Sequence, residues 1–241
     1  MFDELKDQFI SNFITEDRWL SLLKGLGETL KITIFAVILG FFIGLLVAAV
    51  RVSFDYNKTS LSAKGGAAWF FSRVINAICG IYLTVIRGTP VVVQLMIMYY
   101  IVFASSNNST LIAILAFGIN SGAYVAEIFR GGILSVDRGQ IEAGRSLGFS
   151  YVKTMFYIVL PQAFKNALPT LCNEVIVLLK ETSVAGYVGI ADLSKVGEII
   201  RGRTFSAFMP LIAVALIYLT IVLLLTFVFG NFERWLRKSE H

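Results

Sequence analysis

The stretch from Glu142 to Pro161, which reads EAGRSLGFSYVKTMFYIVLP, lies between long apolar runs and yet carries many polar and charged side chains. Arg138, Glu142 and Arg145 recur at steps of four and three residues, and Leu147 adds an apolar position beside them. This spacing predicts a short amphipathic helix. Such a helix lies at a surface, where another protein can bind it.

The composition indicates an integral membrane protein. Of the 241 residues, 56% are hydrophobic and 15% are charged, and the mean hydropathy is +0.75, which is too apolar for a soluble domain. The formal net charge is +5, but the basic residues lie between the apolar runs. The bias of cytoplasmic loops toward Lys and Arg explains them more simply than nucleic-acid binding does, so we expect no nucleic-acid partner.

Residues that hold metals or form disulfides are scarce in this chain. Cys79 and Cys172 lie in or beside apolar segments without the C-x-x-C spacing, and His241 is the only histidine. We therefore expect the cysteines to be small packing residues, and no metal, catalytic residue or cofactor on this chain.

Apolar segments of about the length that a bilayer requires predict an all-α membrane protein with five transmembrane helices in a single domain over residues 1–241. Within the uncharged run between Arg87 and Glu127, the polar stretch 105–110 predicts the tip of a helical hairpin. The expected spans are at about 28–50, 80–104, 110–129, 163–188 and 205–230, and the loop that contains the amphipathic helix covers about 131–161.

The distribution of basic residues predicts the orientation. Basic connections at 51–73 and 130–153 and a basic tail after Arg234 are assigned to the cytoplasm, which places the N-terminus outside and the C-terminus inside. The loop 191–203 is nearly balanced in charge and is assigned to the outside.

Small residues predict close helix packing in two spans. Gly40 and Gly44 share one face of the first span, and Gly118, Gly122 and Ala126 share one face of the third. Such faces let helix backbones approach each other in a membrane.

The fourth span has a polar side. At 100° per residue, Asn173, Glu174, Lys180 and Glu181 fall within an arc of about 120°, and the cost of burying charge in lipid places them toward other helices or a water-filled cavity. One interpretation is a translocation pathway in which carboxylates bind an amine, and Lys180 or Asn173 binds a carboxylate. The other is a set of interhelical hydrogen bonds at a dimer seam. The candidate pathway residues are Asn173, Glu174, Lys180, Glu181, Thr182, Glu127 and Gln94.

The long motif at the start of this section resembles the EAA loop of the membrane subunits of ABC importers. Glu142-Ala143-Gly144, Gly148 and Ile158-Val159-Leu160-Pro161 stand at that motif's distances, with Gly144 where the family usually has alanine. Further runs resemble the polar amino acid uptake branch of these permeases. They are Arg87-Gly88-Thr89-Pro90, the stretch from Ala123 to Ile133, and Leu178-Leu179-Lys180-Glu181-Thr182-Ser183.

The resemblance implies a type I ABC importer permease fold whose cytoplasmic coupling helix fits a groove on an ATPase. It implies two ATPase subunits that bind ATP and Mg, and a second permease that is an identical copy or a related chain. It also implies an extracytoplasmic solute-binding protein that delivers a polar amino acid, with the basic amino acids among the candidates. The implied coupling residues are Arg138, Glu142, Ala143, Gly144, Arg145, Ser146, Leu147 and Gly148.

The residues themselves argue against ATP hydrolysis by this chain, because none of its Lys-Thr or Lys-Ser pairs follows a glycine-rich phosphate-binding turn. An ion-coupled secondary transporter is the alternative function, with Glu174, Glu181 or Glu127 as an ion site. Five unequal spans without a visible internal repeat favour the importer subunit.

Overall fold

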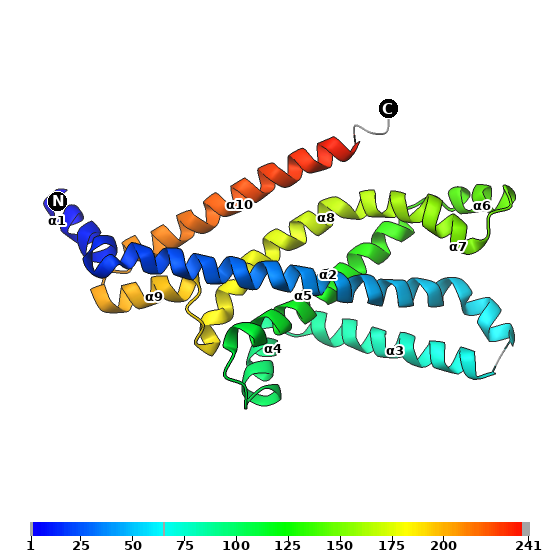
Figure 1. The fold of residues 1–241 in the computed structure, drawn as a ribbon, viewed down its shortest axis with the longest axis horizontal. Helices are drawn as coiled ribbons and strands as arrows, with labels where there is room; N and C mark the ends of the chain where they lie inside the picture. The colour runs from blue at the N-terminus through cyan, green and yellow to red at the C-terminus, as the bar shows by residue number, and fades with distance from the viewer. Residues whose placement is uncertain (1, 65, 238–241) are drawn as a thin grey trace. The chain divides into compact units, whose positions relative to one another are not determined.

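The computed structural model describes residues 2–64 and 66–237, and almost all of them are helical, with no strand in these ranges. Lys238 of the predicted basic tail and His241 lie outside the described residues. Figure 1 shows the order of the helices along the chain.

The chain forms two compact units. Unit 1 comprises Met1–Val37, Pro90–Phe117 and Val175–Val228, and unit 2 comprises Ile38–Thr89, Gly118–Glu174 and Phe229–His241. Four helices, α2 (Arg18–Lys64), α5 (Ser109–Leu134), α8 (Leu160–Glu181) and α10 (Phe208–Arg237), contribute residues to both units. Each unit is described by itself.

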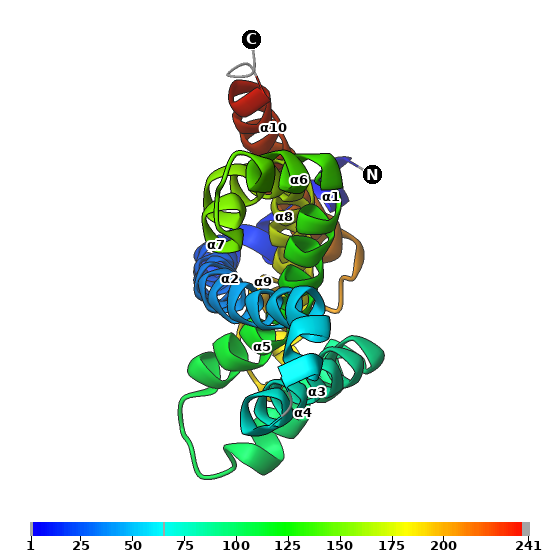
Figure 2. The same cartoon turned by 90° about the vertical axis from the view of Figure 1, so that its right-hand side faces the viewer.

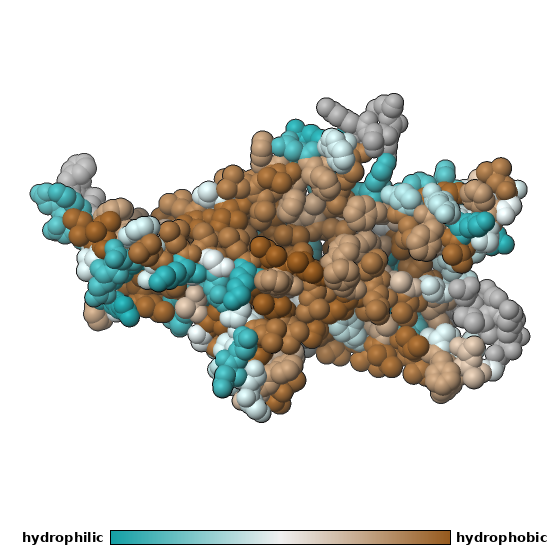
Figure 3. All heavy atoms as spheres, viewed as in Figure 1, coloured by the Kyte–Doolittle hydropathy of each residue, from teal (hydrophilic) through white to brown (hydrophobic). Residues whose placement is uncertain are grey.

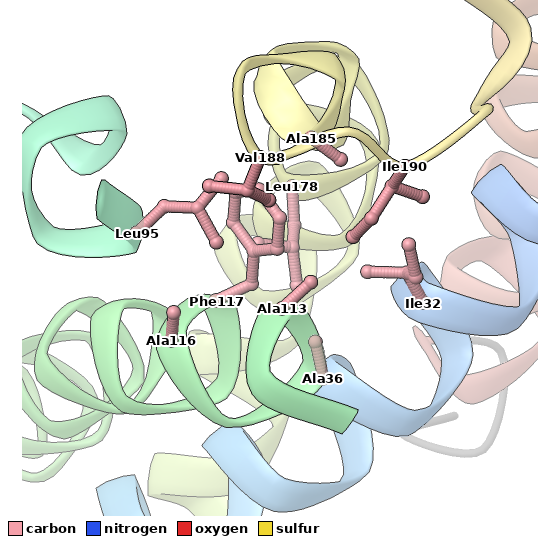
Figure 4. Packing of buried hydrophobic residues seen from close by; sticks show 10 residues of the cluster. All are labelled: Ile32, Ala36, Leu95, Ala113, Ala116, Phe117, Leu178, Ala185, Val188 and Ile190. Atoms are coloured by element: carbon pink, nitrogen blue, oxygen red, sulfur yellow. The ribbon is translucent and has the colours of Figure 1, made fainter. Parts of the chain in front are cut away.

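Unit 1 packs the start of α2 and of α5 against the chain that follows α8. Its main core gathers around Phe117 and Leu95, with Ile32, Leu178 and Val188 beside them (Figure 4). The other elements of this unit are α1 (Phe2–Phe9), η1 (Ile10–Ile14), η2 (Thr15–Asp17), α4 (Val91–Ile97), η3 (Met98–Val102), η5 (Thr182–Val188), α9 (Leu193–Thr204) and most of α10 (Phe208–Arg237).

Unit 2 packs the second part of α2 against α3 (Gly66–Gly88) and the end of α5. Val47, Cys79 and Ala123 belong to one of its apolar clusters, and Figures 1 and 2 both place α3 beside α2. The remaining elements are α6 (Arg138–Ser146), α7 (Tyr151–Thr154) and η4 (Met155–Val159), which precede the α8 residues of this unit.

The small-residue faces of α2 and α5 meet within unit 2, as their spacing predicts. A Cβ added at Gly44 would lie 2.5 Å from Cγ1 of Val125, and one added at Gly40 would lie 3.0 Å from Cβ of Ser121. In the reverse direction, a Cβ at Gly118 would lie 2.6 Å from a methyl group of Leu39. The two helices therefore approach so closely that a side chain at these positions would collide with the neighbouring helix.

Four helical stretches within the described residues are long and apolar enough to cross a membrane. They are Lys6–Tyr56, Gly66–Gly88, Ser109–Leu134 and Phe208–Leu236. The helix α8, in the region of the predicted fourth span, is too polar to qualify, and Val91–Val102 is too short.

The helix bounds differ from the expected ones, and α2 extends beyond the expected first span 28–50 at both ends. Within the expected span 80–104, the chain breaks at Pro90, whose ψ of 136° is extended and whose carbonyl accepts hydrogen bonds from the N–H groups of Val93 and Gln94. The expected external loop 191–203 contains the helix α9, which begins where the side chain of Asp192 caps it.

Candidate functional site

The coupling residues expected from the sequence lie on and directly after α6, in unit 2. Arg138, Glu142 and Arg145 are exposed, and the side chain of Leu147 is 77% exposed. Ala143, Ser146 and Gly148 are exposed as well, whereas Gly144 is buried. Hydrophilic side chains gather over α6 and α7 in Figure 3. The segment presents a polar surface with one large apolar side chain in it.

Two short helices joined by a tight turn form this segment, in place of one continuous amphipathic helix. The α6 helix begins at Asp137, whose Oδ1 accepts a hydrogen bond from the N–H of Gly139 at 2.8 Å. It ends in a Schellman motif, in which Gly148 N–H donates to the Arg145 carbonyl and Phe149 N–H donates to the Gly144 carbonyl. Gly148 has a φ of +85°, which a residue without Cβ adopts at little cost. The positive φ at residue 148 therefore explains why the motif has a glycine at this position.

Gly144 stands where the EAA motif usually has alanine, and its surroundings leave little room for a side chain. A Cβ at this position would lie 2.7 Å from Cδ1 of Ile158 and 3.0 Å from Cγ2 of Thr154. The missing methyl group lets α6 pack closely on η4 and α7. This contact holds the buried face of α6 against the residues that precede α8 and leaves the opposite face exposed.

The turn after α6 is also anchored to α2. The rings of Tyr56 and Tyr151 lie 5.3 Å apart, and Val52 shares an apolar cluster with Ile133 and Val159. Burial, and then the neighbouring Tyr56 phenol, raise the pKa of Tyr151 to about 12, so its hydroxyl stays neutral at physiological pH. A force on α6 would therefore reach α2 through packed side chains.

Two of the expected pathway residues lie on the unit 2 part of α8. The Ser121 hydroxyl donates a hydrogen bond of 3.0 Å to Oε1 of the half-buried Glu174, and Ser121 is itself buried. Asn173, the preceding residue, is exposed. The Glu174 carboxylate is thus held against α5.

Glu127, also in unit 2, belongs to a cluster of charged groups. Its carboxylate accepts hydrogen bonds from Nε and Nη2 of Arg130 at 3.3 and 3.2 Å, and it lies 3.6 Å from Nη1 of Arg87. The Arg87 guanidinium also lies over the ring of Tyr124, 5.6 Å from its centroid. A cavity of about 670 Å³ opens beside these groups, lined by Arg51, Gly80, Leu83, Thr84, Arg87, Gly88, Glu127 and Arg130.

The remaining pathway candidates lie in unit 1. Lys180 is exposed, Glu181 and Gln94 are half-buried, and Thr182 is fully buried. The Thr182 hydroxyl donates to the Leu179 carbonyl at 2.7 Å, so it supports the backbone where α8 gives way to η5. The seven candidates are thus divided between the units. In unit 2, Glu174 has a hydroxyl partner and Glu127 has guanidinium partners.

A second cavity, which the sequence did not indicate, lies within unit 1 and measures about 970 Å³. Three segments that the charge pattern assigns to the outside meet there: the start of α2, the connection 106–110 and the region from Gly189 to Arg203. Arg18, Lys24 and Arg203 are its cationic lining residues and Glu28 is its anionic one. Glu28 accepts a hydrogen bond from the Thr110 hydroxyl. The helical spacing of Leu193, Val196 and Ile200 is the signal that could have indicated α9.

The chain matches a known protein family over most of its length. Residues 59–238 match the family described as "Binding-protein-dependent transport system inner membrane component". The permease protein ArtQ of an arginine transport system from Bacillus subtilis is 35% identical over 91% of this chain and 94% of its own length. The permease protein GlnP of a glutamine transport system from Escherichia coli K12 is 36% identical over 88% of this chain and 91% of its own length.

Solved structures agree with these matches. An amino acid ABC transporter crystallised with histidines has a chain that is 37% identical, with a TM-score of 0.78 over 92% of this chain and 97% of that one. A chain of the methionine ABC transporter MetNI in an inward-facing conformation is 22% identical, with a TM-score of 0.74 over 90% of this chain and 97% of that one, and it supports the fold alone. None of these proteins is described as an ion-coupled transporter.

Proposed function

Because the chain belongs to the family of binding-protein-dependent transport system inner membrane components, we propose that it is the membrane subunit of an importer that carries a polar amino acid into the cell. It is a multi-pass protein of the prokaryotic cell membrane. The substrate class rests on the relatives, whose names state arginine and glutamine transport, and on the 37% identical chain of an amino acid transporter. The match over residues 59–238 is the observation that carries the proposal.

The energy for transport comes from separate ATPase subunits, which bind ATP and Mg. The segment from Arg138 to Gly148 is the surface that such a subunit grips, since its polar side chains and Leu147 are exposed while its underside is packed. An exposed apolar side chain surrounded by charged groups resembles the anchor and rim of a protein interface. This chain itself performs no catalytic step.

Transport follows from a difference in binding energy between two conformations. Closure of two ATPase subunits on ATP moves the coupling segments of two permease chains, and the helices attached to them switch the pathway between inward-open and outward-open states. The second permease chain is an identical copy or a related one. The solute-binding protein docks at the cavity of unit 1, where three segments expected outside converge.

The pathway residues have complementary charges for a zwitterion. Glu174 in unit 2 and Glu181 in unit 1 are each a carboxylate that can attract an ammonium group as it passes, and Asn173 and Lys180 are exposed in the same two units. Arginine, which the name of ArtQ states, is a cation that acidic pathway residues would attract. Glutamine, which the name of GlnP states, has a neutral side chain that polar pathway residues could bind by hydrogen bonds.

The decisive experiment uses the permease reconstituted in vesicles with its ATPase subunit and its solute-binding protein. We expect L-arginine, L-glutamine or L-histidine to stimulate ATP hydrolysis and to accumulate only when ATP is supplied. Uptake that follows an imposed proton or sodium gradient without ATP would contradict the proposal and favour ion-coupled transport.

A further inference from the structure

The cavity of unit 2 contains more positive than negative charge. Three guanidinium groups, those of Arg51, Arg87 and Arg130, line it together with one carboxylate, that of Glu127. All four residues lie within stretches long and apolar enough to cross a membrane. A charged group that is partly buried in a protein requires a partner of opposite charge or a hydrogen bond, so each charge that lines the cavity requires compensation.

Glu127 compensates two of the three cations. Its carboxylate accepts two hydrogen bonds from Arg130 and lies 3.6 Å from Nη1 of Arg87. Arg87 has the Tyr124 ring as a further partner. The charge of these two guanidinium groups is therefore at least partly balanced by neighbouring side chains.

Arg51 lies near enough to Glu127 for their charges to interact, but the described residues give it no direct ion pair with that carboxylate. Its Nε is buried and has no hydrogen-bond partner within the described part of the chain. Nη1 of its guanidinium lies 3.2 Å from the position that a Cβ at Gly80 would occupy, and both residues line the cavity. The absence of a side chain at residue 80 thus makes room for the guanidinium. A buried donor on a charged group without a partner costs more than an ordinary lost hydrogen bond, so an acceptor that enters the cavity would bind strongly.

We propose that Arg51 binds the carboxylate of the transported amino acid in this cavity, with Arg87 and Arg130 supplying additional positive potential. The site rests on the proposed function, which makes an amino acid the substrate. A planar guanidinium offers two parallel N–H donors to the two oxygens of a carboxylate, which selects for molecules that carry this group. This assigns the carboxylate to α2, on a different helix from the Lys180 and Asn173 that the sequence suggested.

Glu127 adds the complementary charge. An amino acid bound through its carboxylate at Arg51 brings an ammonium group into the same cavity, and the Glu127 carboxylate is the only acidic group that lines it within the described residues. The cavity volume of about 670 Å³ is ample for a single amino acid. The arrangement therefore fits the group that all α-amino acids share and leaves the side chain to other residues.

The test measures binding to the purified permease–ATPase complex in detergent, without the solute-binding protein, with radiolabelled L-arginine and L-glutamine as probes. Agmatine, which is arginine without its carboxylate, and 4-aminobutanamide, which is glutamine without its carboxylate, serve as competitors. We expect wild type to prefer the amino acid over its decarboxylated analogue. R51Q should weaken binding of the amino acid by about 10- to 100-fold, the range for a charge-assisted hydrogen bond, and leave binding of the analogue unchanged. R51K should retain part of the preference.

The matched control is R73Q. Arg73 lies on α3 in the same unit, is exposed over the ring of Trp69 and does not line the cavity, so its loss should leave both affinities unchanged. A second variant, G80V, fills the space beside the guanidinium while Arg51 stays in place, and it should reduce the preference as R51Q does.

The outcomes separate this site from the proposed function. Wild-type binding that R51Q leaves unchanged, or an equal loss for amino acid and analogue, would overturn the Arg51 site alone. A wild-type complex that binds neither amino acid would overturn the proposed substrates and this site with them. Native mass spectrometry provides the check on lipid: an anionic phospholipid retained by wild type and lost from R51Q would assign the oxyanion to a lipid phosphate and overturn the amino acid site.

Discussion

Asp192 shows how one side chain can fix the start of a helix. It is fully buried, its two carboxylate oxygens accept hydrogen bonds from the N–H groups of Ser194 and Lys195, and its carbonyl accepts one from Val196. Beside it, the Leu193 N–H donates to the hydroxyl of Thr29 on α2. Asp192 therefore fixes the first turn of α9, and the hydrogen bond of the neighbouring Leu193 joins that turn to α2.

Two substitutions distinguish the effect of the capping hydrogen bonds of Asp192 from the effect of its negative charge. D192A removes both acceptors and should destabilise the first turn of α9 by about 1 kcal/mol, whereas D192N keeps one oxygen and should cost much less. Hydrogen exchange of the amides of residues 194–197 measures the effect directly. Equal exchange rates in D192A and wild type would show that the cap contributes nothing.

The carboxyl group of Asp192 also predicts the direction in which the stability of α9 changes with pH. Burial raises the pKa of Asp192 above its ordinary value, although the backbone hydrogen bonds from Ser194 and Lys195 and the charge of Lys195 oppose the shift. The folded state therefore binds the proton more readily than the unfolded state, so the stabilisation is present below the unfolded pKa and is lost as the pH rises through the folded pKa. We expect slower amide exchange in α9, after correction for the intrinsic rate, at acidic pH in wild type, and no such trend in D192N.

At the scale of elements, the contact between α2 and α5 depends on glycine. The Cβ of G44A would lie 2.5 Å from a methyl group of Val125 and 2.9 Å from the backbone N of Ala126, and the backbone cannot move aside as a side chain can. Overpacking of this kind typically costs about 1–3 kcal/mol, against a gain of about 1 kcal/mol in helix propensity. G44A should therefore lower the thermal midpoint of the purified permease.

Gly27 supplies the control on the same helix. It is exposed, and nothing lies within 4 Å of a Cβ built on it, so G27A should keep the gain in helix propensity and raise the midpoint or leave it unchanged. Similar midpoints for the two variants would contradict the close approach of α2 and α5.

The turn between α6 and α7 tests the coupling segment. Nothing lies within 4 Å of a Cβ at Gly148, so the cost of G148A comes from its positive φ and should be about 1–2 kcal/mol. G148N should cost less, since asparagine adopts this conformation more readily. We expect faster amide exchange in α6 and weaker co-purification of the ATPase subunit with G148A. G131A, with an ordinary φ and open space, should behave like wild type.

These elements also show what a sequence can and cannot predict. The apolar run 110–129 lies inside α5, and the glycine faces of α2 and α5 meet, because uncharged length and small residues are local signals. The helix start after Pro90 is likewise a local signal, because Arg87-Gly88-Thr89-Pro90 interrupts the apolar pattern and proline has no N–H to donate, whereas the wider bounds 80–104 join the residues on both sides of this break. The sequence indicates Arg51 only as the end of a span, since a buried Nε–H without an acceptor is recognised only once neighbouring helices are placed around it.

At the scale of the whole molecule, the proposed importer subunit has two kinds of partner. The solute-binding protein delivers its substrate, and the ATPase subunit supplies its energy. The exposed segment around α6 and the cavity of unit 1 are separate surfaces on different units, so a substitution at one should leave binding at the other intact. The variants proposed for Gly148 should therefore change association with the ATPase and leave association with the solute-binding protein as in wild type.

The cavity of unit 1 predicts how the solute-binding protein associates. Three of its charged lining residues are cationic and one is anionic, although Glu16 pairs with both Arg18 and Arg203 nearby. Lys24 is exposed and has no such pair among the residues that the structure describes, so we expect it to attract an acidic surface on the partner. K24E should lower the association rate constant several-fold at low salt, and the difference from wild type should shrink as salt screens the charges.

The control for this prediction is K6E, which makes the same charge change at an exposed position that does not line the cavity. Surface plasmon resonance with the permease–ATPase complex in nanodiscs gives association and dissociation rates for each variant. If the cavity is the docking site, K24E should slow association more than K6E does, because attraction between exposed charges weakens beyond the Debye length of about 8 Å at physiological salt. Equal effects of the two variants would place the docking surface elsewhere, and an effect of K24E on dissociation alone would indicate a direct contact without long-range attraction.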